Sequence, residues 1–125
     1  MSNAKYIEIR PKTFDPHRIL AYLDALDKHF VKAEIEYDEV KDQVQEVFDY
    51  VVNEKMTNES ISVSLAKVRA TNDERYKKVK KELSDKKKLY LFRKVESKNG
   101  HSYCDHLKTE TINQLAIDKL TTRGQ

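Results

Sequence analysis

Basic side chains gather in one segment of this 125-residue chain, and residue types in that pattern favour binding to phosphate groups. Residues 65–98 contain 13 lysines and arginines against 5 acidic residues, whereas residues 5–64 contain 8 basic and 13 acidic residues. The formal net charge of the whole chain is only +3. A concentrated basic segment attracts polyanions, and the acidic remainder restricts binding to that segment.

Three residues near the start of the densest lysine run are candidates for reading DNA bases. Asn72, Arg75 and Lys78 are expected to reach base edges from the first turns of a helix in the major groove. Asparagine pairs with adenine, and arginine with guanine, through two hydrogen bonds each. These residues would therefore provide sequence specificity.

The remaining candidates are expected to contact the DNA backbone or the minor groove. Lys67, Lys77 and Lys81 are assigned to phosphates, which give affinity and salt dependence but little sequence information. Lys98 and His101 are expected to enter or flank the minor groove. Any one of these side chains is an ordinary solvated charge, so the prediction depends on the cluster.

Apolar spacing predicts a helix-turn-helix as the element that positions these side chains. A short apolar helix is expected over 61–68, followed by a turn around Arg69-Ala70-Thr71. Thr71 and Glu74 match the capping box, in which a hydroxyl and a carboxylate bind unpaired N–H groups where a helix begins. Apolar residues then recur three or four positions apart, so residues of about 72–87 are predicted to form a recognition helix.

After Lys88 the pattern favours extended chain. Residues 89–95 are dense in β-formers, and residues 101–107 are able to return as a second strand. Asn99-Gly100 between them is a strong hairpin signal, because both central residues of a type I′ turn need positive φ. The predicted fold class is mainly α with a small β-hairpin, a winged helix-turn-helix whose β-wing covers about 89–107.

Helices are expected on both sides of this unit. Asp15 is a good N-cap, Pro16 suits the first helical position, and Phe14 is placed to pack on Ile19. We expect one helix over 16–33 and another over 38–54, since Asp38 is able to cap a new helix. The same spacing also permits a single coiled-coil helix over 19–51. A last helix is expected over 109–120.

Length and composition predict one winged-helix domain over 15–121. Residues 1–14 would form an N-terminal arm that includes a cloning remnant at 2–4, and residues 122–125 would fray. There is no signal peptide and no apolar run long enough for a membrane span. With a single cysteine in addition, we expect a cytoplasmic protein.

Sequence signatures of enzymes are missing, so no catalytic residue and no cofactor is predicted. There is no glycine-rich phosphate loop, nucleophile elbow or metal-binding helix motif. His101, Cys104 and His106 are zinc-ligand types, but their spacing fits no standard site, and no metal is predicted. Cys104 is expected to be an inert, half-buried thiol rather than a redox sensor.

The segments 64–71, 80–87 and 88–96, followed by Asn99-Gly100, resemble the MarR-type winged-helix regulators, and the size and layout resemble their small SarA-like branch. The resemblance covers roughly residues 15–120. It implies a homodimer, formed by the N- and C-terminal helices, that binds duplex DNA and regulates transcription. Two alternatives remain: a helical coiled-coil interaction protein, and a winged helix that binds protein as an adaptor.

Overall fold

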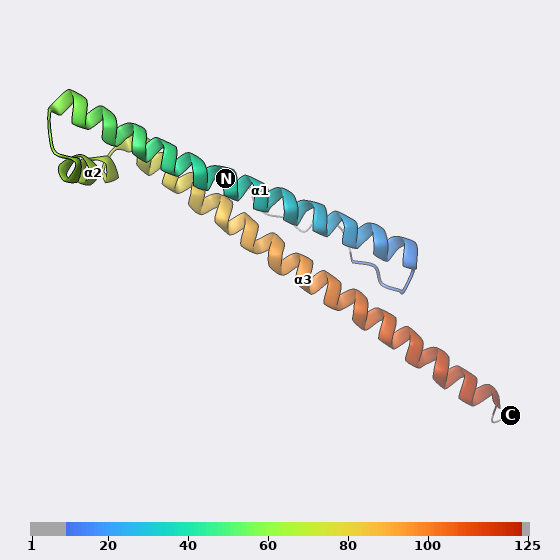
Figure 1. Cartoon of the computed structure of the whole chain (residues 1–125). Coiled ribbons are helices and arrows are strands. Elements are labelled where there is room, and N and C mark those ends of the chain that lie inside the picture. Colours follow the sequence, from blue (N-terminus) through green and yellow to red (C-terminus); the bar gives the residue numbers. More distant parts are fainter. Residues whose placement is uncertain (1–9, 124–125) are drawn as a thin grey trace. The chain divides into compact units, whose positions relative to one another are not determined.

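The computed structural model describes residues 10–123, and this part of the chain forms three helices and no strand. Helix α1 comprises Pro16–Glu59, α2 comprises Val63–Thr71, and α3 comprises Glu74–Arg123 (Figure 1). The predicted β-hairpin is therefore wrong, because the residues of the expected wing, 89–107, lie within α3. The described residues have an all-α fold instead of a winged helix-turn-helix, and the expected last helix over 109–120 is the end of α3.

The expectation of two separate N-terminal helices is also wrong, and the single-helix alternative is correct. Helix α1 continues through Asp38, which is exposed and caps no new helix. Neither glycine nor proline occurs between His17 and Glu59, so no residue type that breaks helices interrupts the hydrogen-bond ladder. Among the described helices, none is long and apolar enough to span a bilayer.

The described chain packs as two compact units. Unit 1 contains the chain up to Val31 together with residues from Phe92 onwards, and unit 2 contains residues 32–91. In unit 1 the first half of α1 and the second half of α3 run antiparallel, and Ile19, Tyr22, Leu26 and Cys104 form the core. Phe14 packs against this cluster, as predicted.

The start of α1 is capped as the sequence predicts. The Asp15 carboxylate accepts a hydrogen bond from the His17 N–H group at 3.1 Å, and Pro16 is the first helical residue. The preceding segment is held to α3, because the Tyr103 hydroxyl donates to the Pro11 carbonyl at 2.7 Å. The Arg10 guanidinium lies 5.1 Å from the centre of the Tyr103 ring.

Gly100 is a helical residue at a close contact between the two helices of unit 1, not a turn residue. A Cβ atom at this position would overlap the Leu26 side chain and lie 3.3 Å from the Tyr22 hydroxyl oxygen. Glycine is therefore required here by the space between α1 and α3. Its backbone φ is not positive, which removes the reason for expecting a type I′ turn.

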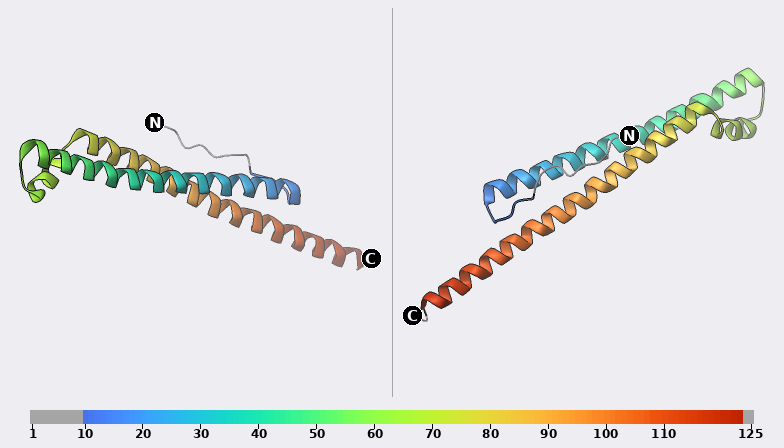
Figure 2. Two further views of the ribbon diagram at one scale, coloured as in Figure 1. Left: turned by 45° about the horizontal axis from the view of Figure 1, so that its top comes forward. Right: turned by 180° about the vertical axis from the view of Figure 1, so that it is seen from behind.

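Unit 2 is closed at one end by α2, which packs on the last turns of α1 (Figure 2). The contact is close because α2 contributes two alanines, Ala66 and Ala70, which are buried against Val51 and Val52. Helix α1 ends before Ser60, whose φ of 53° reverses the chain. The Ser62 hydroxyl then accepts a hydrogen bond from the Leu65 N–H group and caps α2.

Strand-forming residue types in unit 2 pack as helical side chains. The ring of Tyr90 stacks on Tyr37 of α1 at a centroid distance of 5.4 Å and an angle of 6°. The rings of Tyr76 and Phe48 lie 5.3 Å apart in a tilted arrangement. β-Propensity reflects how well a side chain fits a half-buried surface, and the seam between α1 and α3 provides such a surface without a sheet.

We predict that Gly100→Val destabilises the chain by about 1–3 kcal/mol, because the added side chain overpacks the contact with Leu26. Urea unfolding followed by circular dichroism at 222 nm measures the change. Ser102→Val, at an exposed position of the same helix, controls for the helix propensity of valine. Equal stability of the two variants would contradict the close contact.

Candidate nucleic-acid interface

The beginning of α3 is held by a polar cluster that engages Arg75. Asp73 caps the helix, since its carboxylate accepts a hydrogen bond from the Arg75 N–H group at 2.9 Å. The same carboxylate accepts from Arg75 Nε at 3.0 Å and from Nη2 at 3.1 Å. Helix α3 therefore begins at Glu74, near the predicted position, but Asp73 rather than Thr71 provides the cap.

Arg75 also joins α3 to α1. Its Nη1 and Nη2 atoms donate to the two Glu54 carboxylate oxygens at 2.8 and 3.3 Å, a bidentate pair. Lys55 Nζ lies 3.5 Å from Asp73 Oδ2 and adds a second cation to the cluster. We call Glu54, Lys55, Asp73 and Arg75 the clamp.

Hydrogen bonding within the clamp changes the acidity of its members. The hydrogen bonds that Arg75 donates lower the pKa of Asp73 well below its usual range, and they also lower the pKa of Glu54. The hydrogen bonds to Asp73 and Glu54 raise the pKa of Arg75 in turn. Each charge is thus stabilised by its partners.

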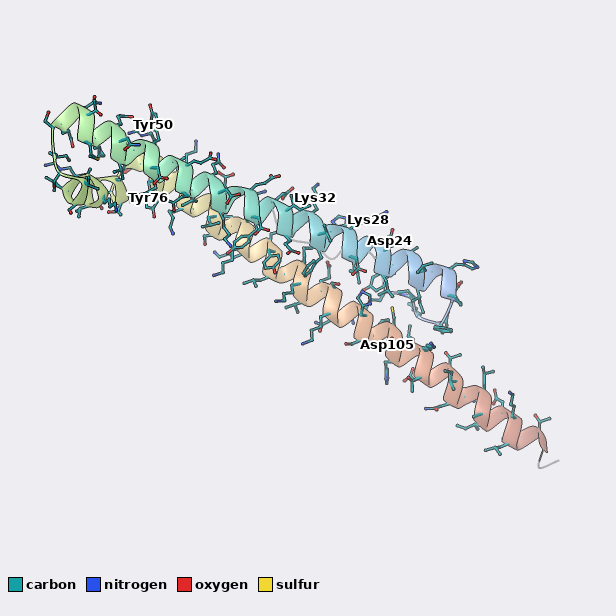
Figure 3. All side chains as sticks on the ribbon, in the orientation of Figure 1. Asp24, Lys28, Lys32, Tyr50, Tyr76 and Asp105 are labelled. Carbon is teal, nitrogen blue, oxygen red and sulfur yellow. The ribbon has the colours of Figure 1, made fainter. Side chains whose placement is uncertain are left out.

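The other two predicted base readers also lie in intramolecular surroundings. Asn72 follows α2 as its C-cap, and its side-chain amide donates to the Val68 carbonyl at 3.4 Å. Lys78 lines a groove of about 440 Å³ in unit 2, together with Glu46, Glu82 and Tyr50 (Figure 3 labels Tyr50). All three residues are exposed, but Asn72 and Arg75 have intramolecular hydrogen-bond partners.

Five lysines of α3 form one exposed surface in unit 2, which we call the lysine face. Two interleaved rows at intervals of three and four residues build it, with Ser84 between them. One row contains Lys77, Lys81 and Lys88, and the other contains Lys80 and Lys87. From Lys77 to Lys88 the face extends about 16 Å along the helix axis.

Acidic side chains border the lysine face along one edge. Glu74, Glu82 and Asp85 form a row with Lys78, and Asp85 lies one helical turn from both Lys81 and Lys88. Within the part of the chain that the structure describes, Lys81, Lys87 and Lys88 have no ion-pair partner, and Lys77 lies 4.0 Å from Glu74. Lys86, which points toward α1, is by contrast paired with Glu36 at 3.2 Å.

Helix α1 in unit 2 presents a surface of the opposite sign. Its exposed acidic residues recur at helical spacing on one side, with Lys41 at the edge of that side and close to the Tyr37 ring. They are Glu34, Asp38, Asp42, Glu46 and Asp49. Opposite charges are therefore separated onto different helices of the unit, so a polyanion is attracted to α3 and repelled by α1.

The remaining candidates fall into three places. Lys67 is exposed on α2, and Lys98 is exposed on α3 in unit 1. Ser97 and His101 lie one turn apart on α3, and the side chains of Ser97 and His101 both bind Asp27 of α1. The wing tip that would have carried Lys98 and His101 into a minor groove does not exist among the described residues, and that part of the prediction is wrong.

Asp27, Ser97 and His101 do not have the geometry of a catalytic triad. The Ser97 hydroxyl donates to Asp27 Oδ1 at 3.0 Å, and His101 Nε2 lies 3.0 Å from the same oxygen. In a triad the serine proton goes to the histidine, whereas here it goes to the carboxylate. The arrangement joins α1 to α3 instead.

Cys104 lies in the core of unit 1, and burial raises the pKa of its thiol. A buried thiol with a raised pKa is a poor nucleophile and a poor metal ligand. The described residues contain no group of three histidine, cysteine or acidic side chains able to hold a metal ion. His106 instead lies 3.0 Å from Glu110, one turn along α3.

Sequence reasoning missed Lys80, Lys87 and Lys88, which complete the lysine face. The signal was present, because the predicted helix over about 72–87 already contained Lys80 and Lys87, and helical spacing places both beside Lys77, Lys81 and Ser84. Comparisons with family models, with curated proteins and with solved structures give no match.

We predict that the clamp contributes stability that is lost at low pH. Asp73 has a lowered pKa in the folded chain, so its contribution is complete above the ordinary value of 3.8 and falls as the pH drops below it. Asp73→Asn should lower the free energy of unfolding at pH 7 and flatten its decline between about pH 4 and pH 2. Urea unfolding across this range measures both effects.

The control for this prediction is Asp85→Asn, at an exposed position of α3 outside the clamp. If both variants lose stability with acid as steeply as the unmodified chain, the clamp is not the source of the acid sensitivity.

Proposed function

We propose that this chain is a non-enzymatic helical protein that binds the phosphate backbone of duplex DNA through the lysine face of α3. The observation that supports the proposal is the placement of five exposed lysines on one side of α3, where acidic residues lie only along one edge. Each lysine that neutralises a phosphate releases a condensed counterion, which makes such binding favourable and salt-dependent.

Duplex DNA is favoured over a single strand by the side chains around the lysines. Proteins that hold single strands usually provide aromatic rings on which bases stack. The uncharged residues of the face are Ser84 and Leu91, and neither is aromatic. Tyr76 and Tyr90 of the same helix are paired with Phe48 and Tyr37 of α1.

Binding is proposed to be largely independent of sequence. Arg75 is committed to Asp73 and Glu54, and Asn72 caps α2, so the residues best suited to base recognition have intramolecular partners. Lysine contacts to phosphates position a protein on DNA but carry little sequence information. The acidic side of α1 would face away from the duplex and keep binding to one side.

We predict that the triple variant Lys81→Gln, Lys87→Gln, Lys88→Gln binds duplex DNA about 10- to 100-fold more weakly at moderate salt. The slope of log K against log salt concentration should become shallower by about 3, one for each lost phosphate contact. Fluorescence anisotropy with a labelled random duplex at several salt concentrations measures both. These side chains are exposed, so circular dichroism should be unchanged.

The matched control is Lys28→Gln, Lys32→Gln, Lys108→Gln, which removes the same charge from exposed positions outside the lysine face. Figure 3 labels Lys28 and Lys32 on α1. Equal loss in both triple variants would show a response to net charge alone and contradict the assigned face. Tighter binding to a single strand than to a duplex would contradict the choice of ligand.

A further inference from the structure

The last turns of α3 extend beyond the part of the helix that packs in unit 1. Leu107 is the last buried residue, and all residues from Ile112 to Thr122 are exposed. From Leu107 to Arg123 the helix continues for about 24 Å. In Figure 3 the labelled residue Asp105 lies shortly before this extension, which we call the C-terminal extension.

Large apolar side chains occupy the C-terminal extension without a partner among the described residues. Ile112, Leu115, Ile117 and Leu120 are between 54% and 70% exposed. Four such side chains within nine residues, distributed around the helix, expose apolar surface of the kind that marks an interaction site.

This patch is not a continuation of the seam with α1. The residues of α3 that face α1 in unit 1 include Gly100, Cys104 and Leu107. Helical spacing continues that row as Thr111, Gln114 and Asp118, which are polar. Ile112, Ile117 and Leu120 lie on other sides of the helix, and Leu115 lies at the edge of this row.

Two opposite charges lie at equal distances on either side of Ile112, one just before the extension and one on it. Asp105, Thr109, Ile112, Ala116 and Lys119 follow one another at intervals of four, three, four and three, so they share one side of the helix. Asp105 lies seven residues before Ile112, and Lys119 lies seven residues after it. Neither Asp105 nor Lys119 is in an ion pair within the part of the chain described.

We infer that a second copy of this chain covers the C-terminal extension, with the two helices antiparallel and Ile112 opposite Ile112 of the other copy. This register places Asp105 of each copy opposite Lys119 of the other, which gives two complementary charge pairs. A parallel pair would place like charges opposite each other and is disfavoured. The contact is isologous, so it closes as a dimer.

The contact is short, so the dimer should be concentration-dependent, and charge reversal tests it without nucleic acid present. The unmodified chain is expected to dimerise reversibly in sedimentation experiments. Asp105→Lys and Lys119→Asp should each weaken the dimer about tenfold or more, because each creates two like-charge pairs. The double variant, Asp105→Lys with Lys119→Asp, should restore the affinity to within about threefold of the original.

Disulfide trapping tests the register independently. Ile112→Cys should form a covalent dimer on mild oxidation, since its thiols face each other across the twofold axis. Gln114→Cys, on another side of the helix, should not, and buried Cys104 provides the background in the unmodified chain. A monomer at about 100 μM, failure of the double variant to restore association, or equal trapping at both positions would overturn the inference.

This result is separable from the DNA proposal. Residues 105, 112 and 119 lie outside the lysine face. The charge-reversal variants should therefore lose the dimer but keep salt-sensitive DNA binding, and failure of one proposal leaves the other standing.

Discussion

The structure depends on α3 remaining a helix through residues that favour extended chain. A helix satisfies its backbone N–H and C=O groups internally, so the stretch around residues 89–95 needs no neighbouring strand. Its aromatic and aliphatic side chains are then packed where they meet α1, as the stacking of Tyr90 on Tyr37 shows.

Charge in unit 2 is divided between side chains that stabilise the fold and side chains that do not. Arg75, Lys55 and Lys86 are paired with Glu54, Asp73 and Glu36, where they connect α1 to α3. The exposed lysines of the lysine face have no such structural role among the described contacts. Exposed surface charges of this kind add little to stability.

In unit 1, polar side chains interact close to the place where α1 and α3 approach each other most closely. Arg93 pairs with Glu96 at 2.9 Å, and the Glu96 side chain is only 3% exposed. Ser97 and His101 both bind Asp27, close in sequence to Gly100, which α1 approaches closely. A buried ion pair adds little net stability, but removing one partner is costly. The contacts of Ser97 and His101 with Asp27 therefore favour one register of α1 against α3 over others.

Local signals were sufficient where one or two residues determine the conformation. Asp15 and Pro16 begin α1 as predicted, because a cap is a short-range hydrogen bond. The start of α3 was placed within a few residues for the same reason, although Asp73 replaced Thr71 as the cap. The concentration of lysines after residue 75 is likewise a property of the chain itself.

The hairpin turn predicted at Asn99-Gly100 is wrong because glycine serves two purposes in proteins. It permits positive φ, and it leaves space for a neighbouring side chain. Which use applies depends on Leu26 and Tyr22, more than 70 residues away in the sequence. The same dependence on distant residues decided that Arg75 binds Glu54. The sequence by itself determined the caps, the helical tendency and the basic segment. The tertiary structure decided which use Gly100 serves and which cations are paired, because distant side chains compete with local preferences for the same space and charges.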